Sequence, residues 1–136
     1  MTCQDYSSRE KMWQQSKYAL DYFRDNKVPF QDMMSSRNFN NPSPVQLPPS
    51  STDWLLSLPN GGRLVVYRKV GNASDGTLTG FPIGTYDVKW FDPRAGGALQ
   101  RGSVISFVVD DSSDFMSYGA PPSTPTLDWV INIRKI

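Results

Sequence analysis

One short loop brings an acidic and a basic residue together with two glycines. The segment from Trp90 to Gly97 reads WFDPRAGG and carries Asp92 and Arg94. In one interpretation this loop contacts a ligand through these two side chains. In the other it is a hairpin loop, because Asp-Pro initiates a turn, glycines permit a positive φ, and Asp92 can accept local backbone N–H bonds. We favour the hairpin loop and keep Asp92 and Arg94 as candidate ligand-binding residues.

Aromatic side chains are the second group that could bind a ligand. The C–H faces of sugars desolvate well against flat indole or phenol rings. The candidates are Trp54, Tyr67, Tyr86, Trp90, Tyr118 and Trp129. Trp90 and Trp129 lie in predicted strands and are expected in the core, whereas Tyr118, in the loop SYGAPP, is expected to be exposed. Trp54 and Tyr118 therefore join the two loop residues as candidates for ligand binding.

The residue types that usually carry hydrolytic chemistry are scarce. The sequence contains no His, which removes the commonest general base and any Ser-His or Cys-His nucleophile. A glycosidase would need a pair of facing carboxylates, but Asp87, Asp92 and Asp128 each have simpler turn or surface interpretations. We therefore predict that the chain is not an enzyme, with no catalytic residue and no cofactor.

Three acidic residues follow a predicted strand at Asp110, Asp111 and Asp114. Carboxylates and carbonyls are the ligands that calcium prefers. The spacing does not match an EF-hand, so we favour a solvated turn and predict no metal site, while calcium binding at this cluster stays open.

Length and charge limit the remaining classes. The 136 residues suit one domain with one core, and 14 Lys and Arg against 13 Asp and Glu leave a net charge of +1. No basic stripe indicates nucleic acid or an anionic membrane as a partner. The first five residues lack the pattern of a signal peptide, so the chain is cytosolic or its export signal lies elsewhere. Cys3 alone indicates no compartment.

A helix is predicted from Ser7 to Lys27. Its apolar stripe repeats at three- and four-residue steps and consists of Met12, Trp13, Ser16, Ala19, Leu20 and Phe23. Ser7 and Glu10 fit a capping box, and Pro29 prevents continuation. Tyr18 and Tyr22 lie on another part of the circumference, so we infer that the helix packs between two bodies.

The remainder is predicted to be an antiparallel β-sandwich, after a connector of residues 35–53 that is rich in Pro, Ser and Asn and is expected to lie over the surface. The strong strand signals are Trp54 to Leu58, Arg63 to Lys69, Thr85 to Phe91, Val104 to Val109 and Asp128 to Lys135. Weaker signals lie at Thr77 to Thr79 and Gly97 to Leu99. Pro59 to Gly62 predicts a hairpin turn, and the fourth strand is expected to be interior because it is apolar on both faces.

Several segments together resemble one protein family. They are TCQDY through Met12-Trp13, YALDYF at 18–23, VPFQDM at 28–33, VKWFDPRAGG at 88–97 and Asp128-Trp129-Val130. The chain resembles the C-terminal region of apiosidase-like bacterial glycoside hydrolases, whose tail domain is commonly labelled a collagen-binding domain of a collagenase. The resemblance covers nearly the whole chain except the connector and the region from Phe107 to Pro125.

The resemblance implies a specific organisation. Residues 1–34 would be the last helix of a catalytic (β/α)-barrel and its exit segment, residues 35–53 the connector, and residues 54–136 the accessory sandwich. The catalytic carboxylates of such proteins lie in the barrel, so none is carried over to this sequence. The implied partner is the preceding glycoside hydrolase domain, and the implied location is secreted or periplasmic.

Two functions follow as expectations. The first is a non-catalytic accessory domain that supports a neighbouring hydrolase structurally. The second is a binding module for polysaccharide, or less readily for collagen, that uses exposed aromatic rings. A helix that has lost its neighbour could also mediate self-association.

Overall fold

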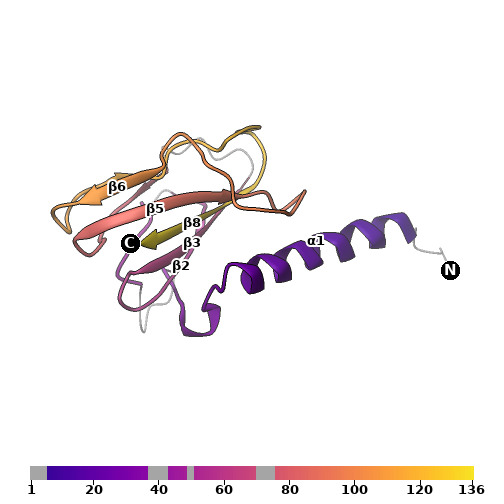
Figure 1. The fold of residues 1–136 in the computed structure, drawn as a ribbon, viewed down its shortest axis with the longest axis horizontal. Helices are drawn as coiled ribbons and strands as arrows, with labels where there is room; N and C mark the ends of the chain where they lie inside the picture. Colours follow the sequence, from indigo (N-terminus) through magenta and orange to yellow (C-terminus); the bar gives the residue numbers. More distant parts are fainter. Residues whose placement is uncertain (1–5, 37–42, 49–50, 70–75) are drawn as a thin grey trace.

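The protein is described by a computed structural model that covers residues 6–36, 43–48, 51–69 and 76–136 (Figure 1). One helix precedes a chain that is mainly β, as the sequence predicts. The elements are α1 (Tyr6–Asp25), a 3-10 helix (Phe30–Asp32), β1 (Met34–Ser35), β2 (Trp54–Ser57), β3 (Arg63–Arg68), β4 (Thr77–Leu78), β5 (Gly84–Phe91), β6 (Ser106–Val109), β7 (Met116–Ser117) and β8 (Trp129–Lys135). Within the described ranges there is no helix whose length and apolar character would let it cross a membrane.

Two antiparallel sheets of unequal size form the sandwich. The larger has six strands in the order β1-β2-β3-β8-β5-β6, and the smaller pairs β4 with β7. The C-terminal strand β8 lies between β3 and β5, so the end of the chain completes the middle of the large sheet. Its residues from Trp129 to Ile133 are all buried. The fold therefore depends on pairing between segments far apart in sequence.

The inner face of the large sheet, which faces the small sheet, carries the main core. As predicted, alternation along β5 and β8 directs every second side chain of these strands to the inner face. The sheet contributes Leu55, Leu64, Val66, Tyr86, Val88, Trp90, Val109, Trp129, Ile131 and Ile133, and the covering layer adds Val45, Leu78, Phe81 and Tyr118. Trp90 and Trp129 are thus core residues, as expected, and their rings meet edge to face with centroids 6.1 Å apart.

The turn between β2 and β3 confirms the predicted hairpin. The Gly61 amide donates to the Leu58 carbonyl at 2.9 Å, and Gly61 has a φ of +66°. A Cβ at this position would also approach the ring of Pro82 to 2.7 Å. Glycine is therefore required here both by the backbone angle and by the close approach.

Three expectations about the chain path are wrong. The strand β6 lies at the edge of the sheet rather than in its interior, and its outward Val108 is exposed because α1 does not extend over this edge. Residues 97–99 form no strand, since only Gln100 makes a bridge, to Trp90. The described part of the connector, 43–48, does not lie over the surface: Val45 is fully buried in the core and Gln46 pairs with Thr79. The weak signal at Thr77 to Thr79, in contrast, does contain a strand, β4.

Helix α1 ends in a Schellman motif, two residues earlier than predicted. The Val28 amide donates to the Phe23 carbonyl at 2.9 Å, and the Lys27 amide donates to the Arg24 carbonyl at 3.1 Å. Lys27 occupies the left-handed position of the motif, with a φ of 49°, where glycine is the usual residue. The predicted capping box rests on the side chain of Ser7, which lies outside the described side chains.

Candidate functional site

The outer face of the large sheet is the face on which α1 lies, and its side chains form rows across the strands. Strand register places Trp54 opposite Tyr67, Tyr67 opposite Val130, and Val130 opposite Phe91. We call these four residues the aromatic row. At the other end of the same face, Arg134 lies between Arg63 and Asp87. The outer face is therefore apolar at one end and charged at the other.

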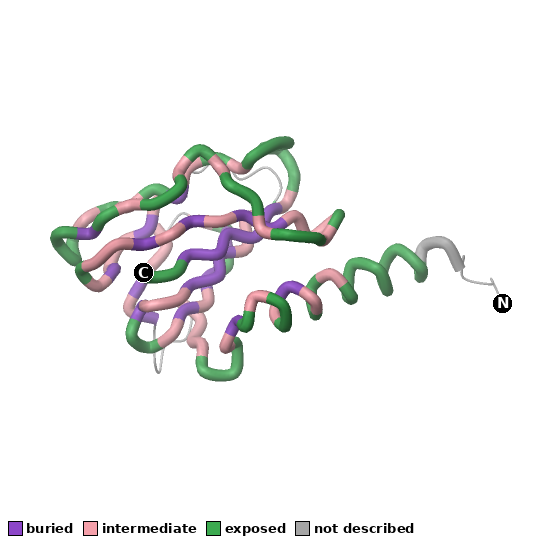
Figure 2. Tube along the Cα trace, viewed as in Figure 1, coloured by how far each residue is buried: buried purple, intermediate pink, exposed green. Residues whose placement is uncertain are grey.

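Tyr22 attaches the C-terminal half of α1 to this face. Its ring packs on Phe91 with centroids 4.7 Å apart, and its hydroxyl donates to the Asn132 side-chain oxygen at 3.3 Å. Burial raises the pKa of Tyr22, so the hydroxyl stays protonated and able to donate. Figure 2 shows that the buried part of α1 is confined to this half, while the other half is exposed.

The loop after β5 supports the helix from the side. Asp92 accepts hydrogen bonds from the backbone amides of Arg94 at 2.9 Å and Ala95 at 3.3 Å, which confirms the hairpin-loop interpretation. Gly96 has a φ of +69°, and a Cβ there would come within 2.5 Å of the Tyr18 ring. The loop thus lies directly against α1.

Arg94 lies in the same loop, and three contacts fix its side chain. Its Nε donates to Asp92 at 2.9 Å, its terminal nitrogen approaches the Thr124 hydroxyl at 3.5 Å, and its guanidinium carbon lies 5.1 Å from the centre of the Trp129 ring. Burial by itself would raise the pKa of Asp92. The hydrogen bonds and positive charge of Arg94, together with the hydrogen bond from the Ala95 amide, have the larger effect, so the pKa of Asp92 is lowered. This ion pair stabilises the loop.

A groove runs between α1 and the aromatic row. One part, of about 240 Å³, is lined almost entirely by apolar atoms of Ala19, Tyr22, Phe23, Trp54, Leu56, Val65, Tyr67, Phe91, Pro93 and Val130. A second part, of about 280 Å³, is lined by Gln15, Tyr67, Pro93, Arg94, Leu127 and Asp128. Tyr67 and Pro93 belong to both parts, so the groove passes from an apolar floor to a polar rim.

Tyr67 links the floor of the groove to the rim. Its hydroxyl donates to the Asp128 carboxylate. Burial, the hydrogen bond and the negative charge of Asp128 together raise the pKa of Tyr67 to about 12. The phenol is therefore protonated at neutral pH. The sequence names Tyr67 among the candidate aromatic residues but does not single out Asp128 for the site, and the hairpin register of β2 and β3 places Tyr67 opposite Trp54.

The predicted site residues do not all come together. Trp54 lies beside the groove with 54% of its surface exposed, and Asp92 and Arg94 lie in the loop at its rim. Tyr118 was predicted to be exposed, and this is wrong: only 1% of its surface is accessible. It follows β7, which covers the inner face, so its ring packs against Trp90 and its hydroxyl donates to the buried Asp53 at 2.9 Å.

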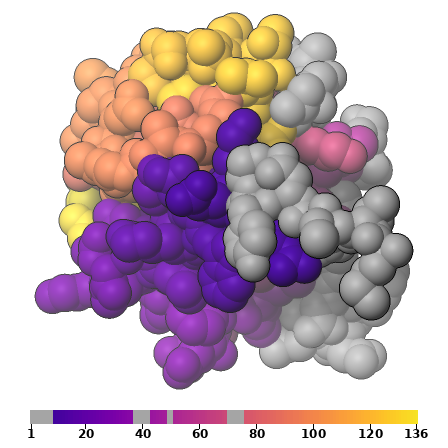
Figure 3. Space-filling view, turned by 90° about the vertical axis from the view of Figure 1, so that its right-hand side faces the viewer, coloured from indigo at the N-terminus to yellow at the C-terminus, as the bar shows by residue number. Residues whose placement is uncertain are grey.

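The apolar stripe of α1 that the sequence predicts is divided. Its Ala19 and Phe23 line the groove beside the sheet, whereas its other large apolar side chains are exposed. Met12, Trp13 and Leu20 keep 59%, 71% and 69% of their surface exposed. Trp13 and Leu20 are seven residues apart, two turns along the same side of the helix, which is opposite to Tyr22. Figure 1 shows the first half of α1 projecting beyond the strands, and in Figure 3 its indigo atoms face the viewer below the orange and yellow segments. We call Met12, Trp13 and Leu20 the exposed stripe.

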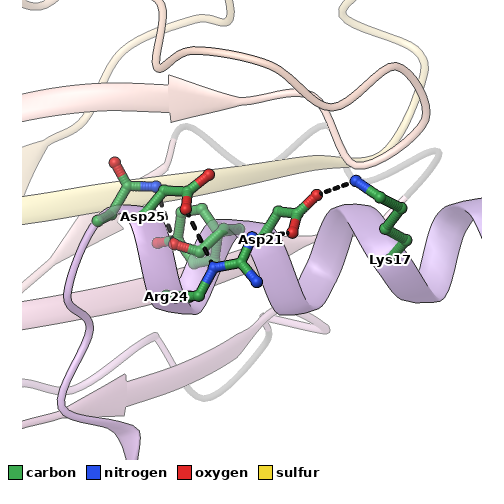
Figure 4. Close-up of polar contacts among 6 residues, drawn as sticks. Lys17, Asp21, Arg24 and Asp25 are labelled. Atoms are coloured by element: carbon green, nitrogen blue, oxygen red, sulfur yellow. Dashed lines mark hydrogen bonds and ion pairs between the residues drawn. The ribbon is translucent and has the colours of Figure 1, made fainter.

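Charged residues cover the side of α1 next to the exposed stripe. Asp21 accepts from Lys17 at 2.6 Å and from Arg24 at 2.5 Å, and Arg24 also pairs with Asp25 at 3.3 Å (Figure 4). The hydrogen bond from Lys17 is the main reason that the pKa of Asp21 is lowered. Such exposed pairs add little stability. They do keep this side of the helix polar, which confines the apolar surface to one stripe.

The acidic residues after β6 form hydrogen bonds within their own turn. Asp111 accepts bonds from both the amide and the hydroxyl of Ser113 at 2.9 Å, and Asp114 accepts from the Asp111 amide at 3.2 Å. Among the described residues no group of three or more potential ligands is placed to hold a metal ion.

Comparison with known proteins does not identify a relative. No protein-family model matches the chain, and no curated protein matches it.

Proposed function

We propose that this chain is a non-catalytic accessory β-sandwich that docks onto a second folded domain through the exposed stripe of α1. The observation that carries the proposal is the orientation of Trp13 and Leu20, which point away from the sheet that α1 contacts through Tyr22. Apolar surface of this kind is costly in water, and in folded proteins it marks interaction sites. Tyr18 and Tyr22 hold the helix on its own sheet, which leaves the opposite side for a partner.

The resemblance supplies a candidate for that partner. It implies a glycoside hydrolase barrel that precedes the sandwich, in a secreted or periplasmic protein, with the helix packed between barrel and sandwich. The charged residues Lys17, Asp21 and Arg24 would then lie at the polar rim of the interface, where such residues are common. Without the barrel, the same stripe would favour self-association of the chain.

A photo-crosslinking experiment tests the docking proposal. A photoreactive residue replaces Trp13 in cells that produce the protein from its own gene, and a matched variant carries it at Ser112, which is exposed in the turn after β6. We expect a strong crosslink from position 13 to a glycoside hydrolase domain, identified by mass spectrometry, and a weak one from position 112. Equal crosslinking from both positions, or none from position 13, would contradict a docking role for the stripe.

A second function, polysaccharide binding, is favoured by one observation. Trp54 is half exposed beside Tyr67, next to a rim that carries Asp128, Arg94 and Gln15. An aromatic surface bordered by polar groups is the arrangement that a sugar ring requires. Collagen is a less suitable ligand, since the groove is short and offers no extended surface for a triple helix.

Binding assays separate the two functions. Plant and algal polysaccharides and fibrillar collagen are tested by pull-down and by intrinsic tryptophan fluorescence, with Trp54→Ala beside Trp13→Ala as a matched control. Saturable binding that only Trp54→Ala abolishes would establish a binding module. If no polysaccharide binds, or if both variants bind as the native protein does, the groove has no role in sugar recognition.

A further inference from the structure

A pocket of polar side chains lies at the charged end of the outer face, where α1 ends. It has a volume of about 270 Å³ and is lined by Asp25, Asn26, Lys27, Arg63, Asp87, Lys89, Leu99, Asn132 and Arg134. These residues come from the helix terminus, three neighbouring strands and the loop after β5. Four of them are cationic and two are acidic, so the pocket carries an excess of positive charge.

Two arginines lie directly opposite each other in this pocket. Arg63 on β3 is paired in register with Arg134 on β8. Like charges in directly opposed positions of antiparallel strands are destabilising. Asp87, the neighbour of Arg134 on its other side, could neutralise one of them, but its carboxylate accepts from Arg101 at 2.5 Å and lies 3.8 Å from Lys89. Asp87 therefore does not neutralise the arginine pair.

Three of the four cations lack a carboxylate partner in the part of the chain that the structure describes. Within the described residues, Lys27, Arg63 and Arg134 form no ion pair, while the second acid of the pocket, Asp25, is paired with Arg24. Arg134 and Lys27 are exposed, so their charged ends are accessible to a small molecule. Three cations around one pocket create a positive potential that attracts an anion.

Arg63 is fixed in position at the base of the pocket. One of its terminal nitrogens donates to the Asn26 carbonyl at 2.9 Å and to the Asn132 side-chain oxygen at 3.1 Å. Its Nε is buried and has no hydrogen-bond partner among the described residues. Burial is the main cause that lowers the pKa of Arg63. A desolvated, immobilised guanidinium of this kind is pre-organised for a second charged group.

Lys27 adds an independent observation. It is one of two non-glycine residues with positive φ in the described part of the chain, and it occupies the position of the Schellman motif that usually belongs to glycine. A lysine there is less favourable for the backbone than glycine. Backbone strain of this kind is a reason to look for a function of the side chain, and the side chain lines the pocket.

We propose that this pocket binds a small carboxylic acid through Arg134 and Lys27, with Arg63 as the fixed cation at its base. The planar fork of an arginine matches a carboxylate with two parallel hydrogen bonds. The volume lies just below the range of pockets that hold drug-sized ligands, so the ligand is about the size of a single sugar ring. The site is separate from both the exposed stripe and the groove, and does not depend on the function proposed for either.

Nuclear magnetic resonance of the arginine side chains tests the proposal. Glucuronate is the probe, glucose is the uncharged molecule of the same size, and ionic strength is held constant. We expect saturable shifts of the Nε–H signals of Arg63 and Arg134 with glucuronate and none with glucose. Absence of saturable shifts, or equal shifts with glucose, would overturn the proposal and leave these cations with only the C-terminal end of α1 to neutralise.

Three variants make the result specific. Arg134→Gln should weaken glucuronate binding by about tenfold, because one charge-assisted hydrogen-bonded pair is lost. Lys27→Gly should weaken binding while raising the melting temperature of the free protein, since glycine suits the left-handed position. Lys135→Gln, the same charge change on the opposite face of β8, should leave binding unaltered. Equal weakening by Lys135→Gln and Arg134→Gln would show a general charge effect and would also overturn the proposal.

Discussion

The inner face of the large sheet buries Tyr86, Val88 and Trp90 completely, whereas on its outer face Trp54 is half exposed and Arg134 is accessible. Both faces come from the same strands by simple alternation. The inner face is covered by β4, β7 and the described part of the connector. Among the described residues, the C-terminal half of α1 covers the outer face, where it buries Val65, Phe91 and Val130 and leaves Trp54 accessible. The difference indicates that the inner face carries the larger core, whereas part of the outer face remains accessible.

Trp90→Ala should produce the largest effect. The ring is fully buried on the inner face against Tyr118 and Trp129. Its removal leaves a cavity and should lower the free energy of unfolding by about 3–5 kcal/mol. Urea denaturation followed by far-ultraviolet circular dichroism measures this. Trp54→Ala on the outer face is the control, and an equal loss there would remove the distinction between the faces.

Tyr118→Phe should have a smaller effect on the same face. It removes the hydroxyl that donates to buried Asp53 and leaves the ring in place. Because a buried carboxylate that loses a donor is poorly compensated, we expect a loss of about 1–3 kcal/mol in the free energy of unfolding. Thermal denaturation at neutral pH provides the measurement. A change indistinguishable from zero would mean that the hydroxyl is exposed, as the sequence alone had suggested.

The titration of the Tyr67 phenol in alkaline solution should report on the environment of the outer face. Its pKa is raised in the folded protein from 10.0 to about 12. A raised folded pKa contributes stability that is fully present below pH 10 and is lost as the pH rises through about 12. Absorbance at the tyrosinate band should therefore show several late-titrating tyrosines, because burial also raises the pKa of Tyr22 and of Tyr86, and Tyr67→Phe should remove one of them. Asp128→Asn, which removes the charge beside the phenol, should shift this titration to lower pH.

Leu20→Ser should have the smallest effect on folding. The side chain is exposed on the outward side of α1 and is not part of either core cluster. Surface substitutions of this kind change stability by about 0.5 kcal/mol or less. Self-association, measured by sedimentation, should nevertheless decrease, because apolar surface is removed. A large loss of stability would show that Leu20 packs within its own domain and would contradict the docking proposal.

Much of the local structure follows from sequence pattern. The alternation of Tyr86, Val88 and Trp90 predicts their shared face, and Asn60-Gly61 predicts the tight turn, because these depend on residues adjacent in the chain. The site is less predictable. Trp54, Asp92 and Arg94 can be suggested as candidates. Asp128, in contrast, joins Tyr67 from 61 residues away in sequence because β8 pairs with β3.

The amino-acid sequence by itself indicates which residues share a face of the helix and of the main strands, because the backbone repeat of each element fixes the direction of its side chains. Only the tertiary structure decides which of those faces is covered. Met12, Trp13 and Leu20 belong to a stripe with the period of a buried surface, yet they are exposed, and the sheet is contacted by Tyr18, Tyr22 and Phe23. Tyr118 and Val45 have the surroundings of surface residues, yet they are buried. Periodicity reports that a side of an element is apolar, whereas burial depends on which distant segment packs against it.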